Sequence, residues 1–590
     1  MTNENDQRHG SNASMKHYFF RASASDFKKI PGSPIAYWVS PSTREAFARY
    51  ESLSKFSDTR IGLITGDNEY YIRQWHEVSH NVIGFEYSRE DAKRSIRKWF
   101  PQSKGGDFRR WYGNNNTVLN WLDDGYELQN KMHGSGERVL AHNFNLDKIF
   151  LSGITWTKIS SGTFGARLQP AGFLFNDASA NAFPLDPAFQ YPLLAFLCSK
   201  LPVEILKAMN PTLNFLPGNI ADLPIAPSLM SSDPLKKISM YLVAASKEDW
   251  DSFEISWNFL YSPLCVRNSR ESSVEAAYER QHLSWRQKTQ EAQRLEQENN
   301  RIFIEAYGLQ DELTPDVPLK EITLTCNPHY RYGGDKTDEE LEALLLADTM
   351  REFLSYAVGC MFGRYSLDKP GLVLANQGET LADYLRQVPE PRFMPDEDNV
   401  IPLLDGEWFA DDVTERFRQF LRVTFGETHY AENLAFIEAA LGRDVRKYFL
   451  KDFYADHVKR YKKRPIYWLF ASPKGTFSAL IYLHRYRPDT VSVVLQYLRD
   501  FRKKLAARLE HLQQVQIGTA ASQGDKTKAG KEADTIRKQQ RELDDYERDT
   551  LYPLATEQVT LDLDDGVKVN YLKLGNALKT IPGLAAKGED

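Results

Sequence analysis

Cysteine is scarce in this chain. Only four cysteines occur in 590 residues, far from one another and without a C-x-x-C pair: Cys198, Cys265, Cys326 and Cys360. A disulfide framework needs several pairs in an oxidising compartment, and a structural zinc site needs clustered ligands. The sequence therefore predicts neither, and the low cysteine content is typical of a protein of the reducing cytosol.

Long apolar segments are also missing. No run approaches the roughly 20 residues that a transmembrane helix requires. The first sixteen residues, MTNENDQRHGSNASMK, are polar and contain no apolar stretch of the kind found in signal peptides. We expect a cytoplasmic protein without membrane contact, in which residues 1–25 are a disordered lead-in.

Signatures of catalysis are scarce as well. The sequence has no Walker loop and no G-x-S-x-G motif. A methyltransferase acting on an exocyclic amino group needs a glycine-rich loop for S-adenosylmethionine and an Asn-Pro-Pro-aromatic loop for the flipped base. The nearest match to the second is Asn327-Pro328-His329-Tyr330, in which histidine replaces the second proline. We interpret it as a strand-ending turn and predict no catalytic residue in this chain.

One histidine pair has the spacing of a metal site. His76 and His80 lie at positions i and i+4, which would place them on one face of a helix. No third ligand is evident, so we favour a packed or surface pair and predict no metal.

Positive charge, in contrast, is concentrated locally although the chain has a net charge of −6. Residues 93–112, KRSIRKWFPQSKGGDFRRWY, form a first basic zone that mixes cations with aromatic side chains. Lysine and arginine neutralise phosphates, and aromatics stack on bases. The predicted phosphate contacts are Lys93, Arg94, Arg97, Lys98, Lys104, Arg109 and Arg110. The alternative is a basic helix face whose aromatics only anchor it to the core.

Several residues in and after this zone have side chains suited to base recognition. Amide side chains form paired hydrogen bonds with adenine, and aromatic rings stack. The predicted base-contact or stacking residues are Gln102, Ser103, Trp111, Tyr112, Asn114, Asn115 and Asn116.

A second basic zone lies within HVKRYKKRPIYWLFASPKGTF, residues 457–477. Two such zones on separate domains are suited to holding a DNA duplex from two sides. The alternative is that one or both zones pair with acidic helices of the same chain. The predicted phosphate contacts here are Lys459, Arg460, Lys462, Lys463 and Arg464.

The fold class expected from the hydrophobic pattern is an α/β domain followed by a mainly α-helical C-terminal region. Alternating segments such as LSGITWTKIS (151–160) predict strands, and apolar residues at helical spacing over 191–210 predict a helix. Residues 273–307 are predicted to form a long helix with a narrow apolar stripe, which we interpret as a spacer or as half of a coiled coil. A stripe over 494–512 and the charged helix after it predict a helical hairpin, and an Asp-Gly turn within 559–575 predicts a β-hairpin.

These patterns divide the chain into six parts. They are the lead-in 1–25, an α/β domain 26–272, a spacer helix 273–310, a mainly helical domain 311–515, a linker 516–533, and a charged helix with a short β-hairpin 534–590.

The order and content of several segments resemble the target-recognition half and C-terminal region of PglX, the adenine-specific DNA methyltransferases of BREX phage-defence systems. The segments are KIPGSPIAYWVS (29–40), TGDNEYYIRQWHEV (65–78), KWFPQSKGGDFRRWYGN (98–114), SGITWTKISSGTFGARLQPAGFLFNDASANAFP (152–184), 193–225 from LLAFLCSKL to NPTLNFLPGNIADLPI, 298–332, KRPIYWLFASPKGTFSALIYLHRY (463–486) and DLDDGVKVNYLKLG (562–575). In that family the cofactor loop and the Asn-Pro-Pro-Tyr motif belong to a domain that precedes such segments.

The resemblance implies a target-recognition domain that binds double-stranded DNA, in a chain that lacks the catalytic domain and holds no cofactor. S-adenosylmethionine would belong to the complete family enzyme. A separate methyltransferase catalytic chain and other BREX proteins are further candidate partners. The alternative hypothesis is a scaffold that docks other defence proteins through the 494–512 stripe and the charged helix after it.

Overall fold

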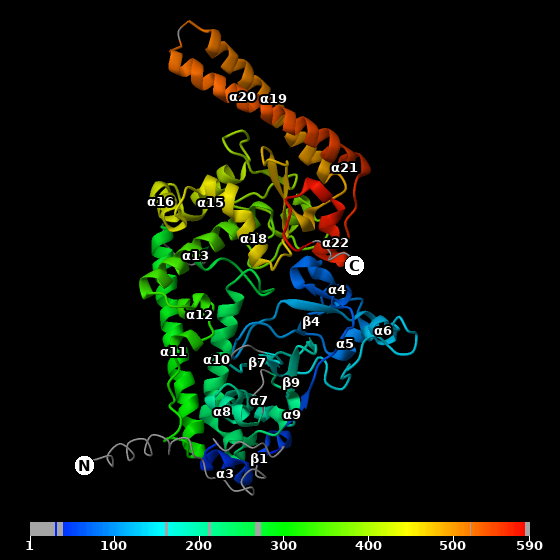
Figure 1. The fold of residues 1–590 in the computed structure, drawn as a ribbon, viewed down its shortest axis with the longest axis vertical. Helices are drawn as coiled ribbons and strands as arrows, with labels where there is room; N and C mark the ends of the chain where they lie inside the picture. Colours follow the sequence, from blue (N-terminus) through cyan, green and yellow to red (C-terminus); the bar gives the residue numbers. More distant parts are fainter. Residues whose placement is uncertain are drawn as a thin grey trace, which may run out of the picture.

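A computed structural model gives the fold for residues 30–31, 39–159, 163–209, 214–265, 273–519 and 521–584. An α/β region occupies one end of an elongated molecule, a helical C-terminal region the other, and a helix pair projects beyond it (Figure 1). The predicted lead-in 1–25 lies outside the described residues. Among the described helices, none is long and apolar enough to cross a membrane.

Two four-stranded sheets form the α/β region. The first has the order β2 (Ser57–Arg60), β9 (Ser179–Pro184), β6 (Gly153–Thr157) and β7 (Ala166–Gln169), with every pair antiparallel. The second has the order β3 (Ile72–Gln74), β5 (Thr117–Asn120), β4 (Trp99–Ser103) and β8 (Leu174–Phe175), in which only β4 and β8 are parallel. The strand predicted within 151–160 is β6. A short pair, β1 (Glu51–Ser52) and β10 (Pro224–Ile225), lies beside them.

Helix α7 (Gln190–Leu197) covers the first sheet, because it contacts β6, β7 and β9. All but its first two residues are buried, which explains the unbroken apolar run PLLAFL. The helix predicted over 191–210 is interrupted, since α8 (Lys200–Met209) begins after a short break. The flanking helices are α3 (Pro41–Arg49), α5 (Arg89–Arg94), α6 (Leu122–Asn130), α9 (Pro217–Ala221) and α10 (Asp233–Asp251).

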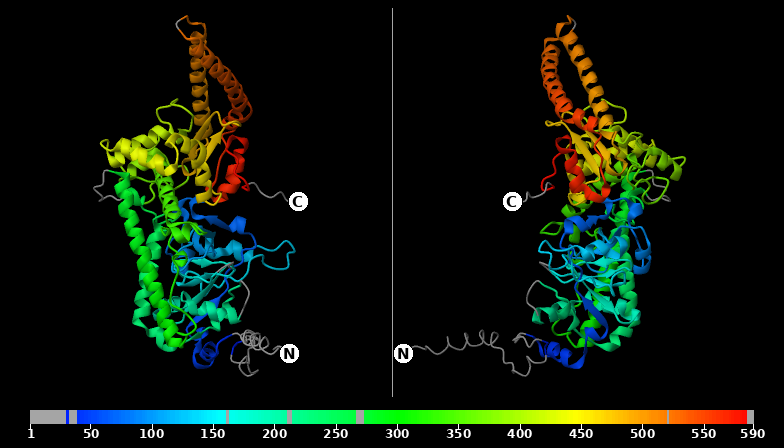
Figure 2. Two further views of the ribbon diagram at one scale, coloured as in Figure 1. Left: turned by 60° about the vertical axis from the view of Figure 1, so that its left-hand side comes forward. Right: turned by 90° about the vertical axis from the view of Figure 1, so that its right-hand side faces the viewer.

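The long helix α11 (Val274–Tyr307) runs along the side of the molecule and joins its two ends (Figures 1 and 2). Its interpretation as a spacer is wrong, because thirteen of its residues are buried. Trp285, Leu295 and Phe303 belong to the main hydrophobic core. Part of the buried face is polar and therefore gives no apolar pattern in the sequence. Glu296, Asn299 and Asn300 are buried and hydrogen-bonded.

The C-terminal region shares that core. Its helices are α12 (Pro328–Tyr332), α13 (Asp338–Met361), α14 (Leu381–Gln387), α15 (Val413–Phe425), α16 (Tyr430–Leu441), α17 (Val445–Tyr448) and α18 (Tyr454–Arg460). A three-stranded antiparallel sheet has the order β11 (Val400–Pro402), β13 (Ser478–Tyr482) and β12 (Tyr467–Ala471). Alternate residues of β12 face two different cores, since Leu469 belongs to the main core and Trp468 to a second one.

The second core lies between this sheet and the last helices of the chain. Helices α19 (Thr490–Ile517) and α20 (Gln523–Tyr546) pack along each other and project together (Figure 2). Two predictions are wrong here. Most of the linker predicted over 516–533 is helical, and the 494–512 stripe is not a free docking surface, because α20 covers it with Ala529, Ala533 and Ile536.

The β-hairpin predicted within 559–575 is also wrong. Residues Leu563–Asp565 form a 3-10 turn, and α22 (Gly566–Lys573) follows α21 (Tyr552–Glu557) after a short connection. The Asp-Gly turn exists, but contacts from the α/β region hold the chain around it. Arg73 donates hydrogen bonds to the backbone oxygens of Asp564 and Asp565, at 3.2 and 3.1 Å.

Candidate nucleic-acid interface

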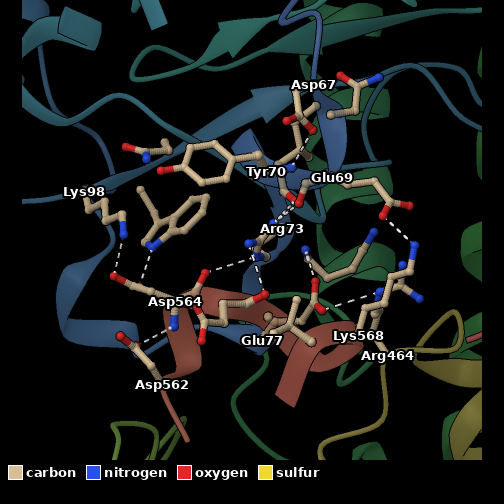
Figure 3. A pocket seen from close by; sticks show the side chains of 18 of the residues that line it. Asp67, Glu69, Tyr70, Arg73, Glu77, Lys98, Arg464, Asp562, Asp564 and Lys568 are labelled. Carbon is tan, nitrogen blue, oxygen red and sulfur yellow. Dashed lines mark hydrogen bonds and ion pairs between the residues drawn. The ribbon is translucent and has the colours of Figure 1, made fainter. Parts of the chain in front are cut away.

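A cleft of about 620 Å³ lies where α4 (Asn68–Tyr71) and β3 of the α/β region face α22 of the C-terminal region (Figure 3). Its walls come from segments that are hundreds of residues apart in the sequence. The charged side chains that line it are Asp67, Glu69, Arg73, Glu77, Lys98, Lys104, Lys462, Arg464, Asp562, Asp564, Asp565 and Lys568.

The two predicted basic zones meet in this cleft. Lys98 and Lys104 of the first zone line one part, and Lys462 and Arg464 of the second line another. The structure therefore brings together four of the predicted phosphate contacts from two regions of the molecule.

Pairing with carboxylates neutralises much of this charge. Lys98 Nζ lies 2.8 Å from Asp564 Oδ2, and Arg464 Nε lies 3.5 Å from Glu77 Oε1. Basic and acidic side chains line the cleft in equal numbers. The cleft is therefore not a uniformly basic groove. The cations without an ion-pair partner are the ones available to bind an anion.

Lys104 and Lys462 are such cations, since no described carboxylate lies within ion-pair distance of either ammonium group. Their concave surroundings lower the pKa of both lysines through partial desolvation. The charge of Arg464 lowers the pKa of Lys104 further, and Lys104 in turn lowers that of Lys462. The more distant charges of Asp177 and Asp107 raise these pKa values in part, but no described carboxylate lies within ion-pair distance, so the two cations form a favourable site for an anion.

The backbone on both sides of the cleft holds these lysines in place. Lys104 follows β4 directly and precedes Gly105 and Gly106, which have positive φ angles of 74° and 134°. A Cβ atom at Gly105 would lie 2.8 Å from the backbone oxygen of Ala178, so this turn requires glycine.

Lys462 has an unusual backbone conformation. After α18 the chain ends its helix with two consecutive left-handed residues, Lys462 (φ 51°) and Lys463 (φ 62°). Glycine or asparagine is normal at such positions, because a Cβ atom there costs about 1–2 kcal/mol. Strain of this kind concentrates at functional sites.

Two of the predicted phosphate contacts, Arg109 and Arg110, are buried instead. Arg110 forms ion pairs with Glu296 of α11 and with Glu321, and Trp111 donates its indole N–H to Glu296 at 2.8 Å. Arg109 donates to the backbone oxygen of Thr323 at 3.2 Å. The phosphate role predicted for this pair is wrong, because both guanidinium groups join the first basic zone to α11 and to the segment that follows it.

Most of the predicted base-contact residues are buried as well. Gln102, Ser103, Trp111, Tyr112, Asn115 and Asn116 are all at most 8% exposed. Their side chains fill the α/β region around β4 and β5, so the base-contact role predicted for them is wrong. Asn114 alone among the seven keeps appreciable exposure, and its side-chain amide donates to the backbone oxygen of Asp107 at 2.9 Å.

The other predicted phosphate contacts lie at the surface. Lys93, Arg94, Lys459 and Lys463 are exposed, and Arg97 is half-buried. Arg460 is different, since its side chain is mostly covered and pairs with Glu254 at 3.1 Å.

Asn327 is not suited to hold an adenine or a cofactor, although it lines a cavity of about 450 Å³. Its side chain is fully buried and donates to the backbone oxygens of Leu319 and Ile322, both at 2.8 Å. Its oxygen accepts the backbone N–H of His329, which caps α12. Both N–H groups of this amide are therefore engaged with backbone oxygens and are not available to a substrate.

The histidine pair is not on one helix. His76 and His80 lie in successive 3-10 turns, and the buried His76 ring contacts the backbone oxygen of Arg464 through Nε2 at 3.1 Å. No group of three metal-ligating side chains occurs within the described ranges.

Several residues of the cleft gave no signal in the sequence. The sequence did not point to Arg73, Glu77, Asp564 or Lys568 as candidate side chains. Their contribution depends on contacts across more than 450 residues, such as the hydrogen bond from the backbone N–H of Val567 to Glu77. No local pattern reports such contacts.

Comparison with known proteins gives two extensive matches. The adenine-specific methyltransferase PglX of Lacticaseibacillus casei (strain Zhang) is 37% identical over 573 residues, which is 94% of this chain and 45% of the relative. The adenine-specific methyltransferase BrxX of Escherichia coli O9:H4 (strain HS) is 36% identical over 588 residues, 96% of this chain and 46% of the relative. No protein-family model matches the sequence.

The chain is therefore similar, along nearly its whole length, to proteins named adenine-specific methyltransferases. It is PglX-like, as the sequence motifs predicted, and it spans less than half the length of the curated relatives it matches.

Proposed function

We propose that this chain is the DNA-recognition and DNA-binding part of an adenine-specific, S-adenosylmethionine-dependent DNA methyltransferase of a BREX phage-defence system. The methyl-transfer chemistry would be supplied from outside these residues. Support for the enzyme class comes from the names of the two relatives. Support for placing the methyl-transfer chemistry outside these residues comes from Asn327, whose amide N–H groups both donate to backbone oxygens.

One observation carries the DNA-binding part of this proposal. Lys104 and Lys462 come from two regions of the molecule, face one cleft, and have no ion-pair partner among the described carboxylates. Their lowered pKa values mean that a bound anion would relieve an electrostatic cost already present in the free protein. A phosphodiester of duplex DNA supplies that anion, with the exposed Lys459 and Lys463 nearby for neighbouring phosphates.

Salt dependence of DNA binding tests the proposal. Fluorescence anisotropy with a labelled duplex, repeated over a range of salt concentrations, gives the slope of log K against log salt. Each phosphate contact contributes about 0.9 to this slope. The double variant Lys104→Ala/Lys462→Ala should bind more weakly and have a slope shallower by about two units.

The matched control is Lys237→Ala/Lys531→Ala, which removes two exposed lysines elsewhere. It should leave the slope nearly unchanged. Equal slopes for the cleft variant and the wild type would contradict DNA binding at this cleft. Transfer of labelled methyl groups to duplex DNA by the purified chain would contradict the placement of the methyl-transfer chemistry outside these residues.

A further inference from the structure

A second cavity, of about 1050 Å³, lies in the C-terminal region between α18, the hairpin of β12 and β13, the base of α19, and residues 579–582. We call it the lysine-rimmed cavity, because six lysines line it and only one acid, Asp405, accompanies them. The six are Lys451, Lys459, Lys462, Lys463, Lys474 and Lys579, and all are exposed.

The rim brings six lysines, unpaired among the described residues, together around one cavity. None of the six ammonium groups lies within ion-pair distance of a carboxylate in the part of the chain that the structure describes. Some exposed lysines elsewhere are paired locally, as Lys503 is with Asp500 and Lys447 with Asp444, both at 3.0 Å. A chain with a net charge of −6 thus gathers unneutralised positive charge at one place.

The wall of the cavity is apolar. Leu450, Tyr454 and Val458 line one side from the segment that ends in α18, and each is half-buried rather than fully covered. Trp408 lines the wall as well, with its ring against Phe501 of α19 at 5.3 Å between centroids. These side chains present aliphatic and aromatic surface within a ring of cations.

We propose that the lysine-rimmed cavity is a docking site for an acidic amphipathic helix of a partner protein. The apolar face of such a helix would lie on the wall, and carboxylates on its flanks would pair with the rim. Charge complementarity selects an acidic partner. The aliphatic side chains of Leu450 and Val458 favour a protein helix over duplex DNA, because a polar, hydrated DNA backbone does not bury apolar surface as the apolar face of a helix does.

This site is separable from the proposed DNA site. Lys462 lines both the cleft and the lysine-rimmed cavity, and the rim lysines Lys459 and Lys463 are also proposed to meet neighbouring phosphates. Lys451, Lys474 and Lys579 line the cavity alone, so that changing them leaves the charged side chains of the cleft in place.

Binding of two labelled probes to the full chain tests the inference. The first probe is an 18-residue peptide with leucines at i, i+3, i+4 and i+7 and glutamates on the remaining face. A scrambled peptide of the same composition, without an apolar face, is its control. The second probe is the labelled DNA duplex. We expect the amphipathic peptide to bind at least tenfold more tightly than the scrambled one.

The triple variant Lys451→Glu/Lys474→Glu/Lys579→Glu should weaken peptide binding at least tenfold and DNA binding less than threefold. Lys237→Glu/Lys528→Glu/Lys531→Glu is the matched control, since it makes the same change in net charge at exposed lysines elsewhere. Val458→Asn should weaken peptide binding alone, with the melting temperature used to verify folding.

Three results would overturn the inference. They are absence of binding by the amphipathic peptide, equal binding of the scrambled peptide, and equal effects of the two triple variants. Loss of DNA binding together with unchanged peptide binding in the cavity variant would instead assign the rim to nucleic acid. Failure of the DNA proposal at Lys104 would leave the docking inference intact, because the peptide measurement does not depend on that residue.

Discussion

Lys98 Nζ and Asp564 Oδ2 lie 2.8 Å apart although 466 residues separate them in the sequence. The other oxygen of Asp564 accepts the indole N–H of Trp99, also at 2.8 Å. One carboxylate thus joins the first basic zone to the C-terminal segment. It also forms an ion pair with Lys98, which the sequence predicted as a phosphate contact.

Replacing Asp564 by alanine should change stability and DNA affinity in opposite directions. Loss of a half-exposed ion pair and of a charge-assisted hydrogen bond should lower the free energy of unfolding by about 1–2 kcal/mol. The change also removes a negative charge from the cleft and frees Lys98, so DNA should bind more tightly. Chemical denaturation and anisotropy measure the two effects, and weaker DNA binding by this variant would argue against the cleft.

The left-handed lysines allow charge to be removed without damage to the fold. Lys463→Gly should raise the free energy of unfolding by up to about 1 kcal/mol, because relief of a left-handed residue outweighs the added flexibility of the unfolded chain. Lys462→Gly should stabilise similarly and weaken DNA binding more than Lys463→Gly does, since Lys462 lines the cleft and Lys463 lies only beside it. A Lys462→Gly variant that is more stable and binds DNA as well as the wild type would exclude this lysine from the interface.

Arg110 should behave as a structural residue. Its removal leaves the buried Glu296 carboxylate without its cation, which should lower the free energy of unfolding by about 3–5 kcal/mol. Arg110→Ala should therefore lower the denaturation midpoint strongly, while the protein that remains folded keeps its salt slope for DNA. Replacing both partners, as in Arg110→Met/Glu296→Leu, should recover much of the loss. A shallower slope for Arg110→Ala would restore the phosphate role.

His457 should make the fold sensitive to acid. Its Nε2 accepts the backbone N–H groups of Ile466 and Tyr467, at 3.2 and 3.0 Å, so this nitrogen cannot carry a proton in the fold. Burial holds its pKa well below the ordinary 6.5, and the charges of Arg460 and His76 lower it further.

In the unfolded chain this histidine takes up a proton near pH 6.5, whereas in the native chain it stays neutral. The free energy of unfolding is therefore unaffected by this residue above that pH and decreases below it. The loss is about 1.4 kcal/mol per pH unit for this one residue. Denaturation between pH 5 and pH 8 measures it. His457→Phe should be less stable at pH 8. Its free energy of unfolding should vary less steeply with pH, by the equivalent of one proton, and an unchanged slope would contradict the assignment.

Local patterns predicted some of the fold well. The alternation in LSGITWTKIS corresponds to β6, whose buried residues pack under α7. Apolar residues at positions 494, 498, 501 and 505 correspond to the buried face of α19. These elements follow from their own side chains, because each has one face that must leave water.

Other elements depend on distant partners. Helix α20 has few apolar residues, yet Ala529, Ala533 and Ile536 at helical spacing are enough when α19 lies opposite them. The turn at Gly566 leads into a helix rather than a strand because Glu77 holds the backbone of Val567. Composition located the two basic zones, but it could not indicate that they meet at one cleft, nor separate Arg109 and Arg110, paired inside, from Lys104, which is not.

Helix α11 constrains how such a chain can change length. At 34 residues it measures about 51 Å, with the backbone N–H of Val274 bonded to Asn433 at one end and the ring of Tyr307 tilted against that of Tyr50 at the other. One inserted residue between Trp285 and Glu296 would turn everything beyond it by about 100° about the axis. The carboxylate would then miss Arg110, so insertions and deletions among natural variants of this chain should fall in its loops and leave this helix uninterrupted.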